Sequence, residues 1–391
     1  MTSTIYNILV DDYYGRFVFS NIRYTSFFIK FNFSPFGIIC ISYRDSFGVI
    51  AGNLGIIHSE TWMIFIASFG GILLTFLSGT EIDVKLMREK FKETFLIGFL
   101  SFLIPFILIF LVVHFLVGWN LMASLLAGTA LSETSIAVVY STLLQQNLFR
   151  YDIGKILMGA TFITNICTAI ALSILFTSPN IYIIIFYAVS ILLLVLAFKY
   201  SYKFLDNSKF LKEKVLEIEI KYIFLLLFIL MFFAALGGGQ AILPVFILGM
   251  LLSNTLNGKS NGQKAKERIK TVAFAVVTPV FFIVGGMKVS IPLVISGIGI
   301  FILIFAFRQV AKFIGVYFVT KKYLDSNTNY VTLMMSTGLT FGLIATLFGL
   351  NIGLIDTYSY SILTGVLVLS AVLPTIIAQK WFTPKHLEDL N

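Results

Sequence analysis

Residues 128–139 read Gly128-Thr129-Ala130-Leu131-Ser132-Glu133-Thr134-Ser135-Ile136-Ala137-Val138-Val139, inside an apolar segment that runs from Trp119 to Leu144. Such a segment is long enough to cross a bilayer, which takes about 20 residues. Hydroxyls and a carboxylate at mid-membrane are costly unless they line a cavity or bind something. Of the nineteen acidic residues, only Glu133 lies well inside a long apolar segment. We therefore expect Glu133 at an ion or proton site, with a carboxylate buried only for packing as the alternative.

The composition identifies a polytopic membrane protein. Hydrophobic residues make up 58% of the chain and charged residues 12%, whereas a soluble domain carries roughly 25% charged residues. We attribute the net charge of +9 to basic cytoplasmic loops and expect no nucleic-acid partner. The sequence holds no Walker loop, zinc-ligand spacing or nucleophile elbow. We therefore expect no cofactor and do not expect an enzyme, and any transport would be coupled to an ion gradient rather than to ATP.

The apolar pattern predicts eleven membrane spans, after an N-terminal segment 1–57 that shows no clear span. The predicted spans are 62–82, 94–118, 120–144, 153–177, 180–198, 222–237, 241–257, 271–288, 291–319, 329–350 and 358–379. If the spans alternate, the basic runs at 85–92, 199–221, 259–270, 321–322 and 380–385 all fall on one side. That side is cytoplasmic by the positive-inside rule. The prediction is a multi-pass protein of the plasma membrane, with a transmembrane domain over 58–380 and a cytoplasmic tail over 381–391.

A weak internal repeat links the two halves of the chain. Thr129-Ala-Leu-Ser132 with Ile136-Ala137 matches Thr337-Gly-Leu-Thr340 with Ile344-Ala345, at an offset of 208 residues. Phe76-x-x-Gly79 matches Phe282-x-x-Gly285 at an offset of 206, and the predicted topology gives these two spans opposite directions. Inverted repeats with polar breaks at corresponding positions are typical of secondary transporters. The hydroxyls either satisfy the freed backbone groups and ligate a cation or simply bond back to their own helix.

Two further spans carry polar groups at depth. Thr164-Asn165 lies at the midpoint of span 153–177, where Asn165 is either part of a site or an interhelical hydrogen bond. Span 291–319 carries Arg308 and Lys312. A buried lysine requires a carboxylate, and Glu133 is the only acid at that depth, so we expect Lys312 to be its charge partner.

These segments resemble the monovalent cation:proton antiporters of the Kef and Nap type, which exchange sodium or potassium for protons. The resemblance covers about 60–380. It rests on Leu74 to Asp83, Ala130 to Ser135, Pro279 to Met287, Lys312-Phe-Ile-Gly315 and Val372 to Ile377, which follow the family's order.

The resemblance implies an all-α, inverted-repeat antiporter fold of 11 to 13 transmembrane helices. Two broken helices, here spans 120–144 and 329–350, would cross in a mobile core formed by about 94–177 and 291–379. The remaining helices would form a panel through which two copies make a homodimer. The family's cation and protons compete for a carboxylate in the helix after the first break, and a Lys or Arg of the tenth helix lies nearby, which Lys312 matches.

Together these observations predict a Na⁺ or K⁺ and proton site at Glu133, Thr164 and Asn165. Ser132 and Thr134 lie beside it, and the broken segments contain Thr129, Ser135, Thr337, Gly338 and Thr340. The chain departs from the family at Asn165, because the family has an acid there and an amide cannot release a proton.

Three hypotheses therefore stay open. The first is a cation:proton antiporter, with Na⁺ favoured over K⁺ and Glu133 as the titrating group. The second is a degenerate member that no longer transports or acts as a channel. The third is an organic-anion carrier on the same architecture, for which Arg308, Lys312 and Asn165 would be suitable ligands.

Overall fold

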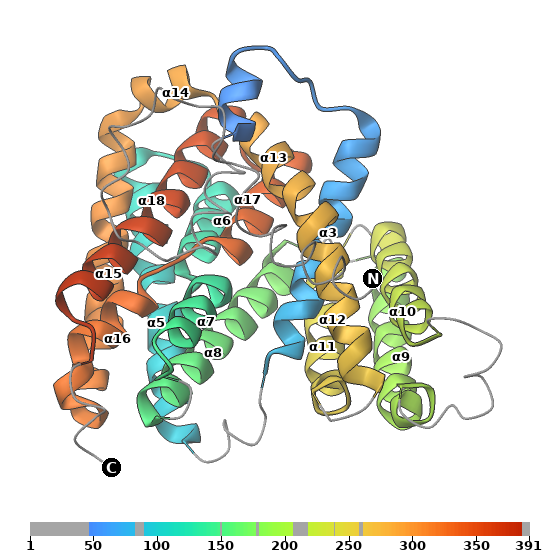
Figure 1. Cartoon of the computed structure of the whole chain (residues 1–391). Coiled ribbons are helices and arrows are strands. Elements are labelled where there is room, and N and C mark those ends of the chain that lie inside the picture. Colours follow the sequence, from blue (N-terminus) through green and yellow to red (C-terminus); the bar gives the residue numbers. More distant parts are fainter. Residues whose placement is uncertain are drawn as a thin grey trace, which may run out of the picture. The chain divides into compact units, whose positions relative to one another are not determined.

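The computed structural model describes residues 47–82, 90–148, 151–176, 180–205, 218–237, 239–257 and 261–384 (Figure 1). In these residues the chain is helical, and ten helices are long and apolar enough to cross a membrane. The shorter apolar helix α11 (Ile242–Leu256) has 15 residues. These eleven segments correspond to the eleven predicted spans. The expectations for residues 1–46, and for the tail beyond residue 384, lie outside the described residues.

Two of the predicted spans are each interrupted near the middle. The first half of the chain contains α3 (Thr61–Thr80), α5 (Phe91–Leu111) with a π-helical end (Val112–Val117), α6 (Leu121–Ser132), α7 (Ile136–Gln145), α8 (Asp152–Leu175), α9 (Ile181–Leu205) and α10 (Ile218–Gly237). The second half, after α11, contains α12 (Asn261–Val272), a π-helical turn (Ala273–Val277), α13 (Thr278–Met287), α14 (Ile291–Ser296), α15 (Ile298–Tyr323), a 3₁₀ turn (Asp325–Asn327), α16 (Thr328–Met335), α17 (Thr340–Asn351) and α18 (Thr357–Trp381). The interruptions 133–135 and 336–339 confirm the two broken helices of the predicted fold.

One helix begins earlier than its hydrophobicity predicts. We expected a span from residue 271, but helical structure begins at Asn261 and continues to Met287. The extra turns are amphipathic, because Ala265 and Ile269 are buried whereas Lys264 is exposed. An amphipathic helix end of this kind is too polar to be recognised as part of a span, since its apolar residues occupy one face only.

Helix packing divides the described helices into two groups. Helices α5, α6, α8 and α15–α18 pack mainly against one another, as do α3 and α9–α13, and a smaller contact joins α8 to α11. Within the second group α3 and α11 cross closely at Gly79 and Gly249. A Cβ on Gly79 would lie against the carbonyl of Phe246, and a Cβ on Gly249 would meet that of Phe76. The residues of the predicted cation and proton site, Glu133, Thr164 and Asn165, lie on or next to helices of the first group.

Local sequence sets where the helices of the first group begin. The side chain of Asn120 accepts a hydrogen bond of 2.8 Å from Ala123 N at the start of α6. Asp356 accepts one of 2.8 Å from Ser359 N at the start of α18. Such N-caps satisfy amide groups that have no partner inside the helix.

The segment before residue 58 is integrated into the packed helices at its described end. Residues 47–53 are helical, and Asn53 there donates to Val289 O at 2.8 Å and accepts from Ile291 N at 2.9 Å. Asn53 thus connects this helix to the linker between α13 and α14.

Candidate functional site

The two helix breaks cross and are joined by hydrogen bonds. Ser135 N, in the first break, donates to Thr337 O in the second at 3.2 Å. Thr134 Oγ1 donates to Met335 O, at the end of α16, at 2.9 Å. The four half-helices α6, α7, α16 and α17, which flank the two breaks, are labelled in Figure 1. The crossing therefore brings residues about 200 positions apart into one site.

Several hydroxyls in and beside the breaks bond to their own helices. Thr129 donates to Leu125 O at 2.8 Å, Ser132 to Gly128 O at 2.5 Å and Thr337 to Met334 O at 2.7 Å. Thr164 likewise donates to Thr161 O at 2.7 Å. These contacts favour the local alternative for four of the predicted hydroxyls. The hydroxyls of Ser135 and Thr340 instead face each other across the crossing at 3.5 Å.

Glu133 is fully buried at the C-terminal end of α6. Neither carboxylate oxygen has a hydrogen-bond partner among the residues that the structure describes. The carboxylate lies at the start of α17, because a Cβ built on Gly338 would be 3.3 Å from Glu133 Oε1. The backbone N–H groups of Leu339 and Gly342 lie near enough to favour the ionised carboxylate, although neither reaches hydrogen-bond geometry with it, and the N-terminus of a helix favours a negative charge. An unpartnered buried carboxylate is costly unless it binds a cation or a proton.

Arg308 bridges the ends of two half-helices. Its Nε donates to Leu131 O at 2.9 Å, and its Nη1 donates to Ser336 O at 2.6 Å. These carbonyls belong to the last turn of α6 and the residue that follows α16, where helix dipoles are negative. Nη2 has no hydrogen-bond partner in the described part of the chain, and it occupies the space beside Gly338. A Cβ at Gly338 would overlap the guanidinium, so any larger residue there would force Arg308 to shift.

Lys312 lies one turn along α15 from Arg308 and also contacts the first break. Its ammonium donates to Ser132 O at 2.7 Å, Ser101 Oγ at 3.0 Å and Thr134 Oγ1 at 3.1 Å. Glu133 forms no ion pair with either cation among the described residues, although both act on its charge at longer range. The expected pairing of Lys312 with Glu133 is thus not a direct contact in this conformation, and their electrostatic coupling stays a prediction.

Asn165 approaches the same break from α8. Its Nδ2 donates to Thr134 O at 3.2 Å, whereas its Oδ1 is buried without a partner in the part that the structure describes. Glu133, which precedes Thr134, and Asn165, which contacts it, therefore both have buried oxygen atoms that accept no hydrogen bond from the described residues. Carboxylate and amide oxygens suit hard cations. This chemistry fits an alkali cation as substrate.

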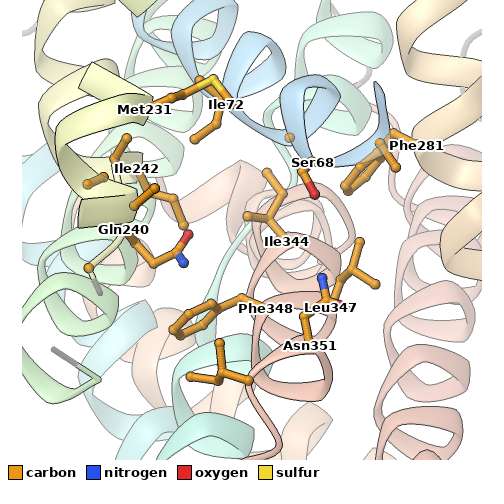
Figure 2. Close-up of a pocket in the computed structure, with 17 residues that line it drawn as sticks. Ser68, Ile72, Met231, Gln240, Ile242, Phe281, Ile344, Leu347, Phe348 and Asn351 are labelled. Carbon is orange, nitrogen blue, oxygen red and sulfur yellow. The ribbon is translucent and has the colours of Figure 1, made fainter. Parts of the chain in front are cut away.

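A cavity of about 280 Å³ opens between the two helix groups (Figure 2). Its polar lining residues are Ser68, Gln240 and Asn351, all of them neutral. The cavity extends along α17 to Ile344. Gly71, Phe281 and Ile344 meet there, since a Cβ on Gly71 would lie 3.5 Å from side-chain atoms of Phe281 and of Ile344. By the predicted topology this is the outer cavity.

A second cavity, of about 140 Å³, lies between the same two groups toward the basic loops. Its lining includes Thr340 and Ile136, the first residues of α17 and α7, so it reaches the crossing of the breaks. At its other end are Glu81, Lys270 and Tyr140. We call this the inner cavity.

Sequence reasoning missed three contributors to this region. Ser101 of α5 contacts Lys312, and the carbonyls of Leu131 and Ser336 bind Arg308. Ser101 could have been found as a hydroxyl in mid-span between apolar neighbours. The two carbonyls could not, because every residue has a backbone carbonyl and only tertiary packing selects which of them meet a cation.

Comparisons with known proteins agree with this geometry. The family model for the transmembrane region of sodium/hydrogen exchangers matches residues 25–382. The match begins inside segment 1–57, which corrects our narrower estimate of about 60–380. The probable Na⁺/H⁺ antiporter 3 of Methanocaldococcus jannaschii is 24% identical over 96% of this chain and 98% of its own length. The Na⁺/H⁺ antiporter of Enterococcus hirae is 27% identical over 90% of this chain and 93% of its own.

A solved structure shares the fold. The sodium proton antiporter MjNhaP1 from Methanocaldococcus jannaschii, at pH 8, has a TM-score of 0.66. It is 17% identical, and the likeness covers 88% of this chain and 92% of that one. The family match and the crossed helix breaks lead to one conclusion: this chain belongs to the transmembrane sodium/hydrogen exchanger family.

Proposed function

We propose that this chain exchanges a monovalent cation, Na⁺ rather than K⁺, for protons across a membrane, and that Glu133 is the carboxylate for which the cation and the proton compete. The observation that carries the proposal is the buried Glu133 carboxylate, which has no hydrogen-bond partner among the described residues at the crossing of the two helix breaks. The names of the relatives, all Na⁺/H⁺ antiporters, support the choice of Na⁺.

The residues around Glu133 would have different tasks. Ionised Glu133 supplies the negative charge for the cation, and Asn165 Oδ1 supplies a neutral oxygen ligand. Protonation of Glu133 removes that charge and releases the cation. Arg308 and Lys312 remain bound to the carbonyls of the breaks and neutralise the half-helix ends, so that the crossing keeps its form in both states.

The alternatives have less support. Asn165 favoured a degenerate member, but the family match and the named relatives favour exchange. Glu133 supplies an acid next in sequence to Thr134, whose carbonyl Asn165 contacts. An organic-anion carrier would need cations that face a ligand. Arg308 and Lys312 are instead engaged by backbone and hydroxyl oxygens of the breaks.

The packing of the helices indicates which of them would move during transport and which would stay fixed. We propose that α5–α8 and α15–α18 form the mobile core and that α3 and α9–α13 form the panel, because each group packs mainly within itself. The two cavities lie at the border between these groups, which supports movement of one group against the other. The family resemblance further implies a homodimer through the panel, in the plasma membrane with the C-terminus in the cytoplasm.

The experiment is proton flux in liposomes that contain the purified protein, with Na⁺, K⁺ or Li⁺ added. Glu133→Gln should abolish cation-dependent flux, because an amide cannot exchange a proton. Its thermal stability in detergent serves as the control for folding. Flux that Glu133→Gln leaves unchanged would refute the assignment. Asn165→Asp should alter the pH profile of an active protein, because it adds a second, interacting acid. If only Asn165→Asp shows flux, the degenerate alternative is correct.

A further inference from the structure

The mouth of the inner cavity contains a compact charged cluster. Glu81 directly follows α3 and forms ion pairs with Lys266, at 3.2 Å, and with Lys270. Both lysines belong to α12. Glu81 and Lys270 line the cavity together with Tyr140 of α7. The cluster therefore lies between the solvent on the basic-loop side and the part of the inner cavity that reaches Thr340.

The two lysines are held very differently. Lys266 is 7% exposed, and its ammonium also donates to Asn257 Oδ1 at 2.6 Å and to Thr80 O at 3.1 Å. Lys270 is 30% exposed, and its ammonium lies 5.8 Å from the centre of the Tyr140 ring. Lys266 is thus a fixed counter-ion for Glu81. The Lys270 ammonium lies closer to the carboxylate, but its side chain is more exposed, so its flexible stem can carry the ammonium into solvent.

Counting only Glu81, Lys266 and Lys270, which the structure describes, the cluster has one positive charge more than Glu81 needs. Lys266 alone neutralises the carboxylate, so Lys270 adds a positive charge at the mouth that repels incoming cations. Charges act on one another over about 8 Å at physiological ionic strength. The mouth of the inner cavity therefore attracts a cation more strongly when the Lys270 ammonium is away from the Glu81 carboxylate than when the two are paired.

We propose that Glu81 is a second binding site for the transported monovalent cation, at the mouth of the inner cavity, where the cation displaces Lys270. Hydroxyls continue the path inward: Ser78 lies one turn before Glu81 on α3, and the buried hydroxyl of Thr278 has no hydrogen-bond partner among the described residues. The path ends at Thr340, which faces Ser135 at the crossing. This inference rests on the proposed function, because it assumes that the cation moves between the inner cavity and the crossing.

The proposal predicts an effect on one face of the membrane only, since the polar residues that line the outer cavity are neutral. Na⁺-dependent proton flux is measured in everted vesicles, which present the basic-loop face to added Na⁺, and in right-side-out vesicles. Lys270→Gln should lower the KM for Na⁺ on the basic-loop face by about two- to fivefold, the range of an exposed ion pair, and leave the other face unchanged. Lys270→Arg should keep the original KM, and so should Lys264→Gln, which removes an exposed charge from the same helix. Equal changes on both faces, or equal changes for Lys264→Gln and Lys270→Gln, would overturn the proposal.

A second measurement does not depend on transport. Ser78→Cys, in a chain with Cys40 and Cys167 replaced by serine, is labelled from the basic-loop face with a membrane-impermeant maleimide. Na⁺ should slow labelling more than choline does at the same ionic strength, and Glu81→Gln should remove that difference. Identical rates in Na⁺ and choline would contradict a cation site at Glu81, whatever Glu133→Gln does to flux. Failure of Glu133-based exchange would appear in the flux assay alone, so the two failures are distinguishable.

Discussion

The two helix breaks occupy equivalent places in the two halves of the chain, but they contribute different groups. The first break, 133–135, carries the carboxylate of Glu133 and the carbonyl that Asn165 binds. The second break, 336–339, has no ionisable side chain and provides Gly338, which leaves space for both Glu133 and Arg308. An internal repeat thus preserves the backbone geometry of a site while its charge is confined to one half. The first break therefore provides the ionisable carboxylate, and the second provides a glycine that leaves room for it and for the Arg308 guanidinium.

Arg308→Ala should have the largest effect, because Arg308 bonds both to the last turn of α6 and to Ser336, which follows α16. We expect a loss of about 3–5 kcal/mol in the free energy of unfolding, since two buried carbonyls lose their donor and Glu133 loses a nearby positive charge. Thermal unfolding in detergent measures this loss. Gln309→Ala, at the next position of α15, is the control and should cost far less. If both variants lose the same stability, Arg308 does not hold the two breaks together.

Lys312→Ala tests the first break alone, because Lys312 contacts Ser132 and Thr134 but no residue of the second break. We expect it to cost about 2–4 kcal/mol, since a buried carbonyl and two hydroxyls lose their donor and Glu133 loses a positive charge nearby. Combining Lys312→Ala with Glu133→Gln should recover part of this loss. A double variant whose loss equals the sum of the two single losses, to within about 0.5 kcal/mol, would show that the two charges are not coupled.

Gly338→Ala tests the space that the second break provides. The added methyl group would overlap the Arg308 guanidinium, so we expect a cost of about 1–3 kcal/mol and a reduced flux. Gly299→Ala is the matched control, because a Cβ at Gly299 meets no atom within 4 Å. It should leave stability unchanged or raise it slightly, as Gly to Ala does in an open helical position. Equal stabilities of the two variants would mean that Arg308 moves aside without cost.

Ser135→Ala should have the smallest effect. Its hydroxyl meets that of Thr340 at 3.5 Å, which is the outer limit of a hydrogen bond. We expect a loss of at most about 0.5 kcal/mol in stability, whereas Thr134→Ala, which removes a bond of 2.9 Å to Met335 O, should cost more. A larger loss for Ser135→Ala would mean that the side-chain contact between the breaks is stronger than its distance indicates.

The sequence was sufficient to predict the fold class and the spans that are broken. Hydroxyls and a carboxylate in apolar surroundings mark places where a regular helix is unfavourable, and both breaks lie within a turn of the repeated motif. The register of the breaks was not predictable. Ser132 and Thr340 align in the repeat, yet Ser132 is the last residue of α6 and Thr340 is the first of α17. Hydroxyls satisfy backbone groups on either side of a break, so the motif does not say on which side the helix ends.

The candidate site was predicted in its members but not in its contacts. Glu133, Asn165 and Lys312 were recognisable because charged or amide side chains are rare at mid-membrane. The binding of Lys312 to Ser101, Ser132 and Thr134 depends on how α5 and α15 pack, and so does the role of Arg308. The ion pairs of Glu81 lie at the end of a span, where charged residues are ordinary and carry no signal in the sequence.

The two cavities also determine where the membrane potential acts. On α3 the outer cavity ends at Ile72 and the inner cavity begins at Leu74. Two residues of a helix correspond to an axial rise of about 3 Å, against a hydrocarbon core of about 30 Å. Wherever water fills both cavities, the voltage falls mainly across the thin apolar layer between them. A charge that crosses this layer experiences nearly the whole potential, about 2.3 kcal/mol per 100 mV, within a single turn of helix.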